Sequence, residues 1–171
     1  MLDSIPPLIE GHAVSNVRVV IYEDLQCKDC AWFRTKMDEV LLPAYSDRAA
    51  FEHREFPLPK HSWARLAAIA ARYYPGELGV VFRREIQADR EGITAASLPL
   101  WIRDFADRHR TTEALLEDPS LIAAVEGDYQ MGLAREVKKT PTLFLDEQIF
   151  VERISMEKLM GAINKALEPL Q

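Results

Sequence analysis

Cys27 and Cys30 are the only cysteines in this chain of 171 residues, and two residues separate them. A β-branched and apolar run at residues 17–23 comes before them and predicts a strand. Residues 31–42 follow, with apolar side chains at helical spacing. If a helix begins at Cys27, its free N–H groups and its macrodipole stabilise a thiolate there. Cys30 would lie one turn further along the same helix face, where it can form a disulfide with Cys27. The pair therefore predicts a redox site.

A metal site is the main alternative chemistry for these two cysteines. Zinc needs further ligands, and the chain offers only histidines that lack the usual partner spacing: His12, His53, His61 and His109. Copper(I) binding by an exposed dithiol also stays open as an alternative. A disulfide scaffold is excluded, because such scaffolds need several cysteine pairs and this chain has one.

The composition is that of an ordinary globular protein, with 48% hydrophobic and 28% charged residues. The net charge of −6 argues against nucleic acid or an anionic membrane surface as a partner. No apolar run is long enough to cross a bilayer, and residues 1–7 do not resemble an export signal. We therefore expect a cytoplasmic protein, or a periplasmic or otherwise extracytoplasmic one if the chain is a trimmed mature domain.

The elements around the cysteines can be predicted from pattern and from turn residues. The strand at 17–23 is almost continuously apolar, which is typical of a strand covered on both faces. We expect the helix after Cys27 to end at Pro43. A second strand is predicted over 49–56, and a short edge strand around 12–14.

Residues 61 to about 137 have a helical pattern. Asp118 and Pro119 mark one helix start within this block. Two short strands then flank residues 146–148 in a predicted hairpin, and Ser155 caps a closing amphipathic helix. The expected order is β-α-β, a helical block, and β-β-α.

In this order the chain resembles DsbA-like thiol–disulfide oxidoreductases of the thioredoxin superfamily along nearly its whole length. Four stretches carry the resemblance: the Asp-x-Gln turn and C-x-x-C within residues 22–30, residues 54–58 with 61–68, the Thr-Pro-Thr loop within 139–144, and the closing helix. The resemblance implies an α/β thioredoxin-like fold with an inserted all-helical cap at about 60–135. It also implies one domain covering residues 1–171.

The resemblance identifies Pro141 as the family's cis-proline, packed opposite Cys27 beside a substrate groove. Only X-Pro bonds adopt the cis form at low cost, and the backbone of Thr140 could pair with an extended peptide. An ordinary trans proline at the start of an edge strand is the alternative. We assign Cys27 as the attacking, more exposed sulfur and Cys30 as the resolving one.

The residues between the cysteines depart from the family pattern. Lys28 would favour a Cys27 thiolate and Asp29 would oppose it, so inspection leaves the direction of electron flow open. Lys138 and Lys139 could add positive potential through the Pro141 loop, or could be two solvated loop residues.

A buried acid commonly stands six residues before the first cysteine in this family, and here that residue is Ile21. Glu23 could replace it in part, but we interpret Glu23 as a solvated residue at the strand end. His61 is interpreted as a capping or surface residue, and Trp32 as part of the core.

The sequence thus predicts a thiol–disulfide oxidoreductase with a Cys27/Cys30 couple and with Thr140 and Pro141 in the substrate site. We expect no metal and no organic cofactor. The expected partners are protein or peptide thiols and disulfides, or small ones such as glutathione, and a redox partner that recycles the pair. Two alternatives remain: a metal-binding or metal-chaperone protein, and a glutathione-linked transferase or isomerase on the same fold, which commonly lacks the paired cysteines.

Overall fold

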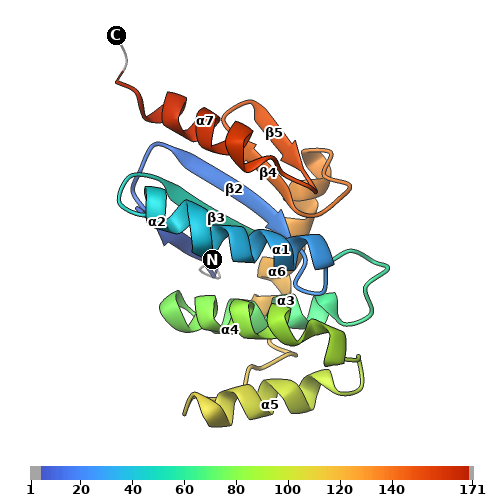
Figure 1. The fold of residues 1–171 in the computed structure, drawn as a ribbon. Coiled ribbons are helices and arrows are strands. Elements are labelled where there is room, and N and C mark those ends of the chain that lie inside the picture. Colours follow the sequence, from blue (N-terminus) through green and yellow to red (C-terminus); the bar gives the residue numbers. More distant parts are fainter. Residues whose placement is uncertain (1–4, 170–171) are drawn as a thin grey trace.

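The structure is a computed structural model that describes residues 5–169 (Figure 1). Within those residues, five strands form one sheet of order β1-β3-β2-β4-β5. The strands are β1 (Ile9–Gly11), β2 (Arg18–Glu23), β3 (Ala50–Glu55), β4 (Thr142–Leu145) and β5 (Gln148–Val151). β2 and β3 run parallel, and the other neighbouring pairs run antiparallel. The end of β2 therefore lies beside the start of β4, which places the cysteine turn next to the proline loop.

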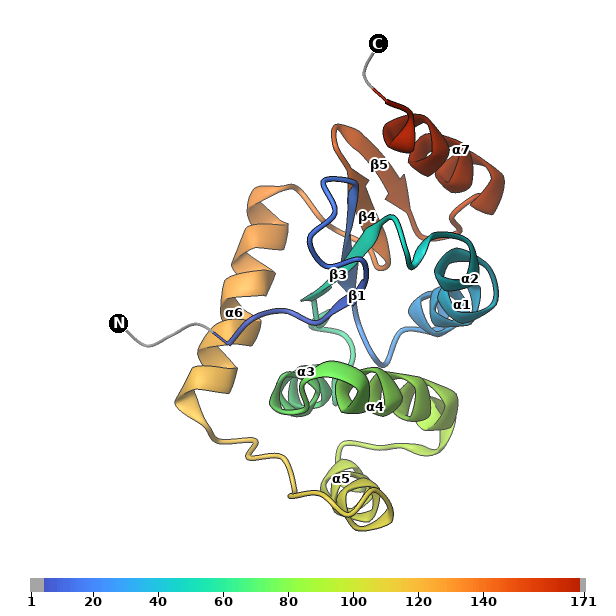
Figure 2. The same cartoon turned by 90° about the vertical axis from the view of Figure 1, so that its left-hand side faces the viewer.

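The helices cover both faces of the sheet and form a further layer beside it (Figures 1 and 2). One face carries α1 (Lys28–Lys36), the π-helical segment η1 (Met37–Leu41), α2 (Leu42–Tyr45) and α7 (Met156–Leu167). The other face carries α6 (Pro119–Ala134). The inserted region also holds α3 (Ala64–Tyr73), α4 (Gly76–Asp89), the 3₁₀ turn η2 (Arg90–Gly92) and α5 (Leu98–Arg108). The predicted helical insertion between the two halves of the sheet is confirmed.

Side chains of β2 alternate between the two covered faces, as the apolar run predicts. Val19 and Ile21 pack against α1 and α7, while Tyr22 packs on the opposite face with Phe56. Gly132 of α6 comes so close to Phe56 that a Cβ at this position would lie 2.6 Å from the ring. The absence of a side chain at Gly132 thus lets α6 rest directly on the sheet.

Pro43 does not end the first helix, so that prediction is wrong. Helical backbone continues from α1 through η1 into α2, which reaches Tyr45. In η1 the N–H of Leu42 donates to the carbonyl of Met37, five residues back. This wider turn places Pro43 in the first turn of α2, where a helix does not need the N–H that proline lacks.

The first strand lies earlier than predicted. β1 covers Ile9–Gly11 and pairs with β3, whereas residues 12–14 form a turn. Gly11 has a positive φ of 79°, which ends the extended backbone at that residue.

The local signals elsewhere are confirmed. Asp118 accepts a hydrogen bond from the N–H of Ser120 at the start of α6, and Ser155 accepts one from Lys158 at the start of α7. β4 and β5 form the predicted hairpin, and Asp146 adopts the left-handed conformation in its turn. Among the described residues, no helix is both long and apolar enough to cross a membrane.

Candidate active site

The two cysteines lie where β2 passes into α1. Cys27 is the N-cap residue of α1, and its N–H donates to the carbonyl of Asp24 at 3.0 Å. Cys27 is 8% exposed and Cys30 is fully buried, and both are free thiols. The N–H of Asp24 points at the Cys30 sulfur, 3.4 Å away. Solvent therefore reaches only the first sulfur of the pair.

The environment separates the acidities of the two thiols. A hydrogen bond from Cys30 lowers the pKa of Cys27 to about 6; burial and the charge of Asp24 oppose this shift, and Thr140 supports it. Burial raises the pKa of Cys30 well above its ordinary value, and the Cys27 sulfur and the charge of Glu23 add to the rise. At neutral pH Cys27 is thus mainly a thiolate, and the fully buried Cys30 keeps its proton. This is the state in which a dithiol can attack a disulfide.

The proline loop lies directly against the first sulfur. The Thr140-Pro141 peptide bond is cis, as predicted. In its protonated form, the Cys27 thiol donates to the Thr140 carbonyl oxygen, and the sulfur lies 3.5 Å from that oxygen. The Pro141 carbonyl accepts a hydrogen bond from the N–H of Glu152 at 2.8 Å, and this bond ties the loop to the end of β5. The structure thus brings together the four residues that we singled out for the site.

The Asp-x-Gln turn links the cysteines to the inserted helices. The Asp24 carboxylate is buried and accepts hydrogen bonds from the N–H groups of Gln26 and Leu58. Its Oδ2 also lies 2.7 Å from Nδ1 of His61. Gln26 Oε1 in turn accepts a hydrogen bond at 3.0 Å from the N–H of Trp63, just before α3 begins. His61 is therefore an ordered part of the site wall and not a helix cap or a solvated residue.

Glu23 is buried, so its interpretation as a solvated strand-end residue is wrong. Its Oε1 lies 2.7 Å from Nδ1 of His53 and 2.7 Å from Nη1 of Arg83. Burial opposes ionisation of Glu23, but His53 and Arg83 lower its pKa to about 2. A fixed negative charge thus stands close enough to Cys30 to raise the pKa of that thiol. Ile21 is an ordinary core residue.

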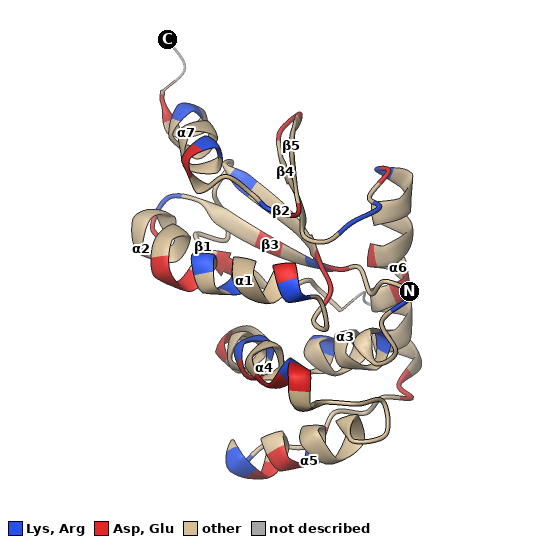
Figure 3. Cartoon of the chain, turned by 45° about the vertical axis from the view of Figure 1, so that its right-hand side comes forward, with Lys and Arg blue, Asp and Glu red and all other residues tan. Residues whose placement is uncertain are grey.

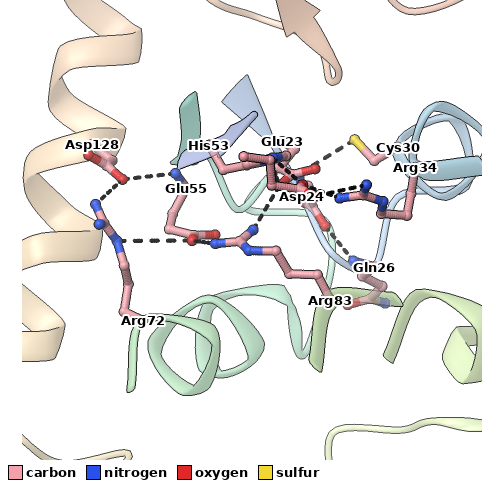
Figure 4. Close-up of polar contacts among 11 residues, drawn as sticks. Glu23, Asp24, Gln26, Cys30, Arg34, His53, Glu55, Arg72, Arg83 and Asp128 are labelled. Atoms are coloured by element: carbon pink, nitrogen blue, oxygen red, sulfur yellow. Dashed lines mark hydrogen bonds and ion pairs between the residues drawn. The ribbon is translucent and has the colours of Figure 1, made fainter. Parts of the chain in front are cut away.

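Glu23 belongs to a buried network of ion pairs that spans several elements (Figure 4). On one side, His53 Nε2 lies 2.8 Å from Glu10 Oε1, and Arg34 of α1 binds Glu10 with both of its terminal nitrogens. Burial opposes the charged form of His53, yet Glu23 and Glu10 raise its pKa above the ordinary value. Strand β1 is thereby joined to α1 and β3 by charged groups.

On the other side the network continues into the insertion. Arg83 of α4 donates to Glu55 at the end of β3, and Arg72 of α3 donates to Asp128 of α6. Asp128 also accepts hydrogen bonds from Arg54 at 2.8 Å and from the N–H of Glu55 at 3.0 Å. Sequence reasoning missed this network. One signal was available: four consecutive polar residues, 52–55, lie within the predicted strand at 49–56.

A cleft of about 720 Å³ opens at Cys27. Its walls are the 58–61 segment, the 138–140 loop and the start of α1. A second depression on the other side of Lys28 and Asp29 is lined by Trp32, Arg153 and Ile154. Trp32 is 40% exposed, so its assignment to the core is wrong. Within residues 5–169, no three His, Cys, Asp or Glu side chains are grouped as a metal site would require.

A sequence model of the thioredoxin family matches residues 4–165. The chain therefore belongs to the thioredoxin family, and its fold is the DsbA-like form with an inserted helical region. Alpha-DsbA1 of Wolbachia pipientis superposes with a TM-score of 0.79 over 93% of this chain and 89% of its own, at 14% identity. No curated protein sequence matches the chain.

Two further solved structures have the same fold. BdbD from Bacillus subtilis, in its oxidised form, has a TM-score of 0.80, covers 95% of this chain and 94% of its own, and is 18% identical. A periplasmic thioredoxin-like protein from Salmonella enterica serovar Typhimurium has a TM-score of 0.78, covers 97% and 92%, and is 15% identical. These likenesses confirm the predicted α/β thioredoxin-like fold.

Thr140→Val is expected to raise the pKa of Cys27 from about 6 to about 7. The buried Thr140 hydroxyl forms no hydrogen bond in the described part of the chain, so it is free to donate to a Cys27 thiolate, and it lowers the pKa of Cys27. A hydrogen bond to a charged group contributes about 1.5–3 kcal/mol, enough to shift a pKa by about one. The pH dependence of iodoacetamide alkylation measures this value.

Thr142→Val is the matched control for that measurement. It removes a hydroxyl that donates to the Lys139 carbonyl in the same loop, without removing a group that influences the sulfur. An equal rise in both variants would show that loosening of the loop, and not loss of the Thr140 hydroxyl, sets the pKa.

Proposed function

We propose that this protein exchanges disulfides with thiols of proteins, peptides or small molecules through the Cys27/Cys30 pair. The observation that carries the proposal is the separation of the two thiols. Cys27 faces a cleft with a pKa of about 6, while Cys30 is sealed beneath it with a raised pKa. The adjoining cis-proline loop, with Thr140 and Pro141, supports the same function, because an extended substrate can lie along it.

The chemistry proceeds in two displacements. The Cys27 thiolate attacks one sulfur of a substrate disulfide, forms a mixed disulfide with it and releases the other sulfur as a thiolate. Cys30 then loses its proton and attacks the Cys27 sulfur, which closes the Cys27–Cys30 disulfide and releases the second substrate thiolate. Two electrons pass from the protein dithiol to the substrate. The same steps in reverse oxidise a substrate dithiol, and a separate redox partner restores the starting state.

The buried ion network supports this cycle by fixing charge near Cys30. Glu23 is held ionised by His53 and Arg83. Its negative charge keeps the proton on Cys30 while Cys27 is the thiolate, because two adjacent anions repel one another. Attack therefore begins at Cys27, the sulfur that the substrate can reach.

The reduction potential of the pair tests the proposal. We expect a reversible two-electron couple between about −270 mV, the value of thioredoxin, and about −120 mV, the value of DsbA. The reason is that a Cys27 pKa of about 6 lies between about 7 and about 3.5, the values of the corresponding thiols in those proteins. Equilibration against glutathione buffers, with free thiols counted by mass spectrometry, gives the potential.

The absence of any reversible couple would overturn the proposal. Titration of the reduced protein with copper(I) or zinc would then test the metal-binding alternative.

The measured reduction potential also indicates in which compartment the protein can act. A potential near −120 mV suits an oxidising compartment, and the Salmonella protein of this fold is described as periplasmic. A potential near −270 mV suits a reductant of the cytoplasm.

A further inference from the structure

The cleft at Cys27 is basic, although the chain as a whole is acidic. The net charge of the protein is −6. The cleft nevertheless combines four lysines with only two carboxylates, Asp29 and Glu152. In Figure 3, blue marks the loop that leads from α6 to β4, and blue and red lie side by side at the start of α1.

The four lysines line the cleft from three different segments. Lys138 and Lys139 come directly before the cis-proline loop, Lys60 stands on the facing 58–61 segment, and Lys28 follows Cys27 itself. All four side chains are exposed. Lys139 pairs with Glu152 at 3.1 Å, whereas the other three form no ion pair within residues 5–169. Segments far apart in the sequence thus place unpaired positive charge in the cleft onto which Cys27 opens.

Neither the fold nor the acidity of the thiol accounts for these lysines. Exposed like charges that converge on one cleft repel one another and do not stabilise a fold. The groups that shift the pKa of the Cys27 thiol most are Cys30, Thr140 and Asp24, and none of them is a lysine. The positive charge is therefore available to an incoming molecule.

We propose that the cleft selects disulfide and thiol substrates that carry carboxylates beside the reacting sulfur. This inference rests on the proposed function and names its substrate class. A cleft with an excess of one sign of charge attracts ligands of the opposite sign, and such attraction can raise their rate of encounter by about tenfold or more. Two sources offer this chemistry: a γ-glutamyl tripeptide such as glutathione, and a peptide whose cysteine has Asp or Glu neighbours.

The reaction of the reduced protein with three small disulfides tests the inference. The probes are oxidised glutathione, which is anionic, 2-hydroxyethyl disulfide, which is neutral, and cystamine, which is cationic. Each rate constant is divided by the rate constant for 2-mercaptoethanol with the same disulfide. This normalisation removes differences in intrinsic reactivity among the three disulfides. At low ionic strength we expect the normalised rate constant for oxidised glutathione to exceed that for cystamine at least about tenfold. Added salt should reduce this ratio.

A second arm separates the two sources. Two peptides of equal length, each joined to 2-mercaptoethanol by a disulfide, carry either Glu or Lys on both sides of the cysteine. A preference for the Glu peptide that matches or exceeds the preference for oxidised glutathione indicates a peptide substrate. A preference confined to oxidised glutathione indicates the small thiol. Either result supports carboxylate selection.

The paired substitution Lys60→Gln and Lys138→Gln should lower the ratio of glutathione disulfide to cystamine several-fold. The ratio is the chosen readout because any change in the reactivity of Cys27 affects both rate constants and cancels. The control pair, Lys158→Gln and Lys165→Gln, removes the same charge from exposed positions on α7 and should leave the ratio as it is.

Equal ratios for the natural protein and the cleft variant would overturn the inference. Failure of the neutral disulfide to react at all would instead overturn the proposed function, and the inference with it.

Discussion

Cys30→Ala is expected to stop exchange at the mixed disulfide, so that nearly every molecule carries one substrate thiol on Cys27. Without a resolving thiol, the adduct leaves only when an external thiol attacks it. Cys27→Ser is expected to lower the exchange rate more than about a thousandfold, because the exposed nucleophile is lost and nucleophile loss has effects of this size or larger. Mass spectrometry of the products measures the first effect, and stopped-flow kinetics with a disulfide substrate measures the second.

The two variants control for each other. Cys27 is 8% exposed and Cys30 is fully buried, so only the first sulfur can meet a substrate in the folded protein. If Cys27→Ser still formed a stoichiometric adduct on Cys30, the assignment of roles would be reversed. If both variants exchanged at the natural rate, neither sulfur would be the nucleophile.

The parts of the fold that could be predicted are those with local causes. Asp118 and Ser155 cap their helices through bonds to residues two or three positions on, so a short window of sequence contains the whole interaction. The strand before Cys27 is covered by helices on both faces and therefore consists mainly of apolar residues. Its burial could thus be predicted from its composition alone. The cis-proline was predicted from resemblance, since composition alone would favour a trans bond.

Some predictions were wrong because a local sequence signal was overridden by contacts with distant parts of the chain. Pro43 is a strong stop signal in a regular helix, but η1 changes the hydrogen-bond pattern before it. Such a shift depends on packing against the sheet and leaves no short motif. His61 was given a generic surface role because its partner, Asp24, is 37 residues away in sequence.

The buried ion network could not have been predicted from pattern. Charged residues are ordinarily assigned to the surface, because a single buried charge is costly. The cost is offset here by partners far along the chain, for example Glu23 and Arg83, which are 60 residues apart. The charged run in β3 was visible in the sequence, but without its partners it did not show which residues it pairs with or that these residues are buried.

Arg83→Met is expected to lower the free energy of unfolding by about 3–5 kcal/mol at neutral pH. Arg83 is 1% exposed and binds Glu23 and Glu55, which are themselves buried. Methionine fills much of the same volume but leaves Glu23 with only His53, and Glu55 with only a 4.0 Å contact to Arg72, as cationic partners among the described residues. Removal of one partner from a buried pair has a cost of this size. Urea unfolding followed by tryptophan fluorescence measures the change.

The next residue of the same helix provides the control. Arg84 also forms an ion pair, with Asp38 at 2.6 Å, but its side chain is 45% exposed. Arg84→Met should therefore lower the free energy of unfolding by less than about 1 kcal/mol, as is usual for pairs in contact with solvent. A loss in Arg83→Met as small as that in Arg84→Met would show that the buried ion pairs of Arg83 contribute no more to stability than an exposed pair does.

A double substitution shows whether the loss arises from uncompensated charge. Glu55→Gln removes one of the two carboxylates that Arg83 compensates and keeps the shape of the side chain. In a protein that already carries Glu55→Gln, Arg83→Met should lower the free energy of unfolding by less than it does in the natural protein, because less charge is then left unpaired. Additive losses would mean that the two groups stabilise the fold independently. In that case the packing of the aliphatic part of the Arg83 side chain, and not its charge, would account for the loss of stability.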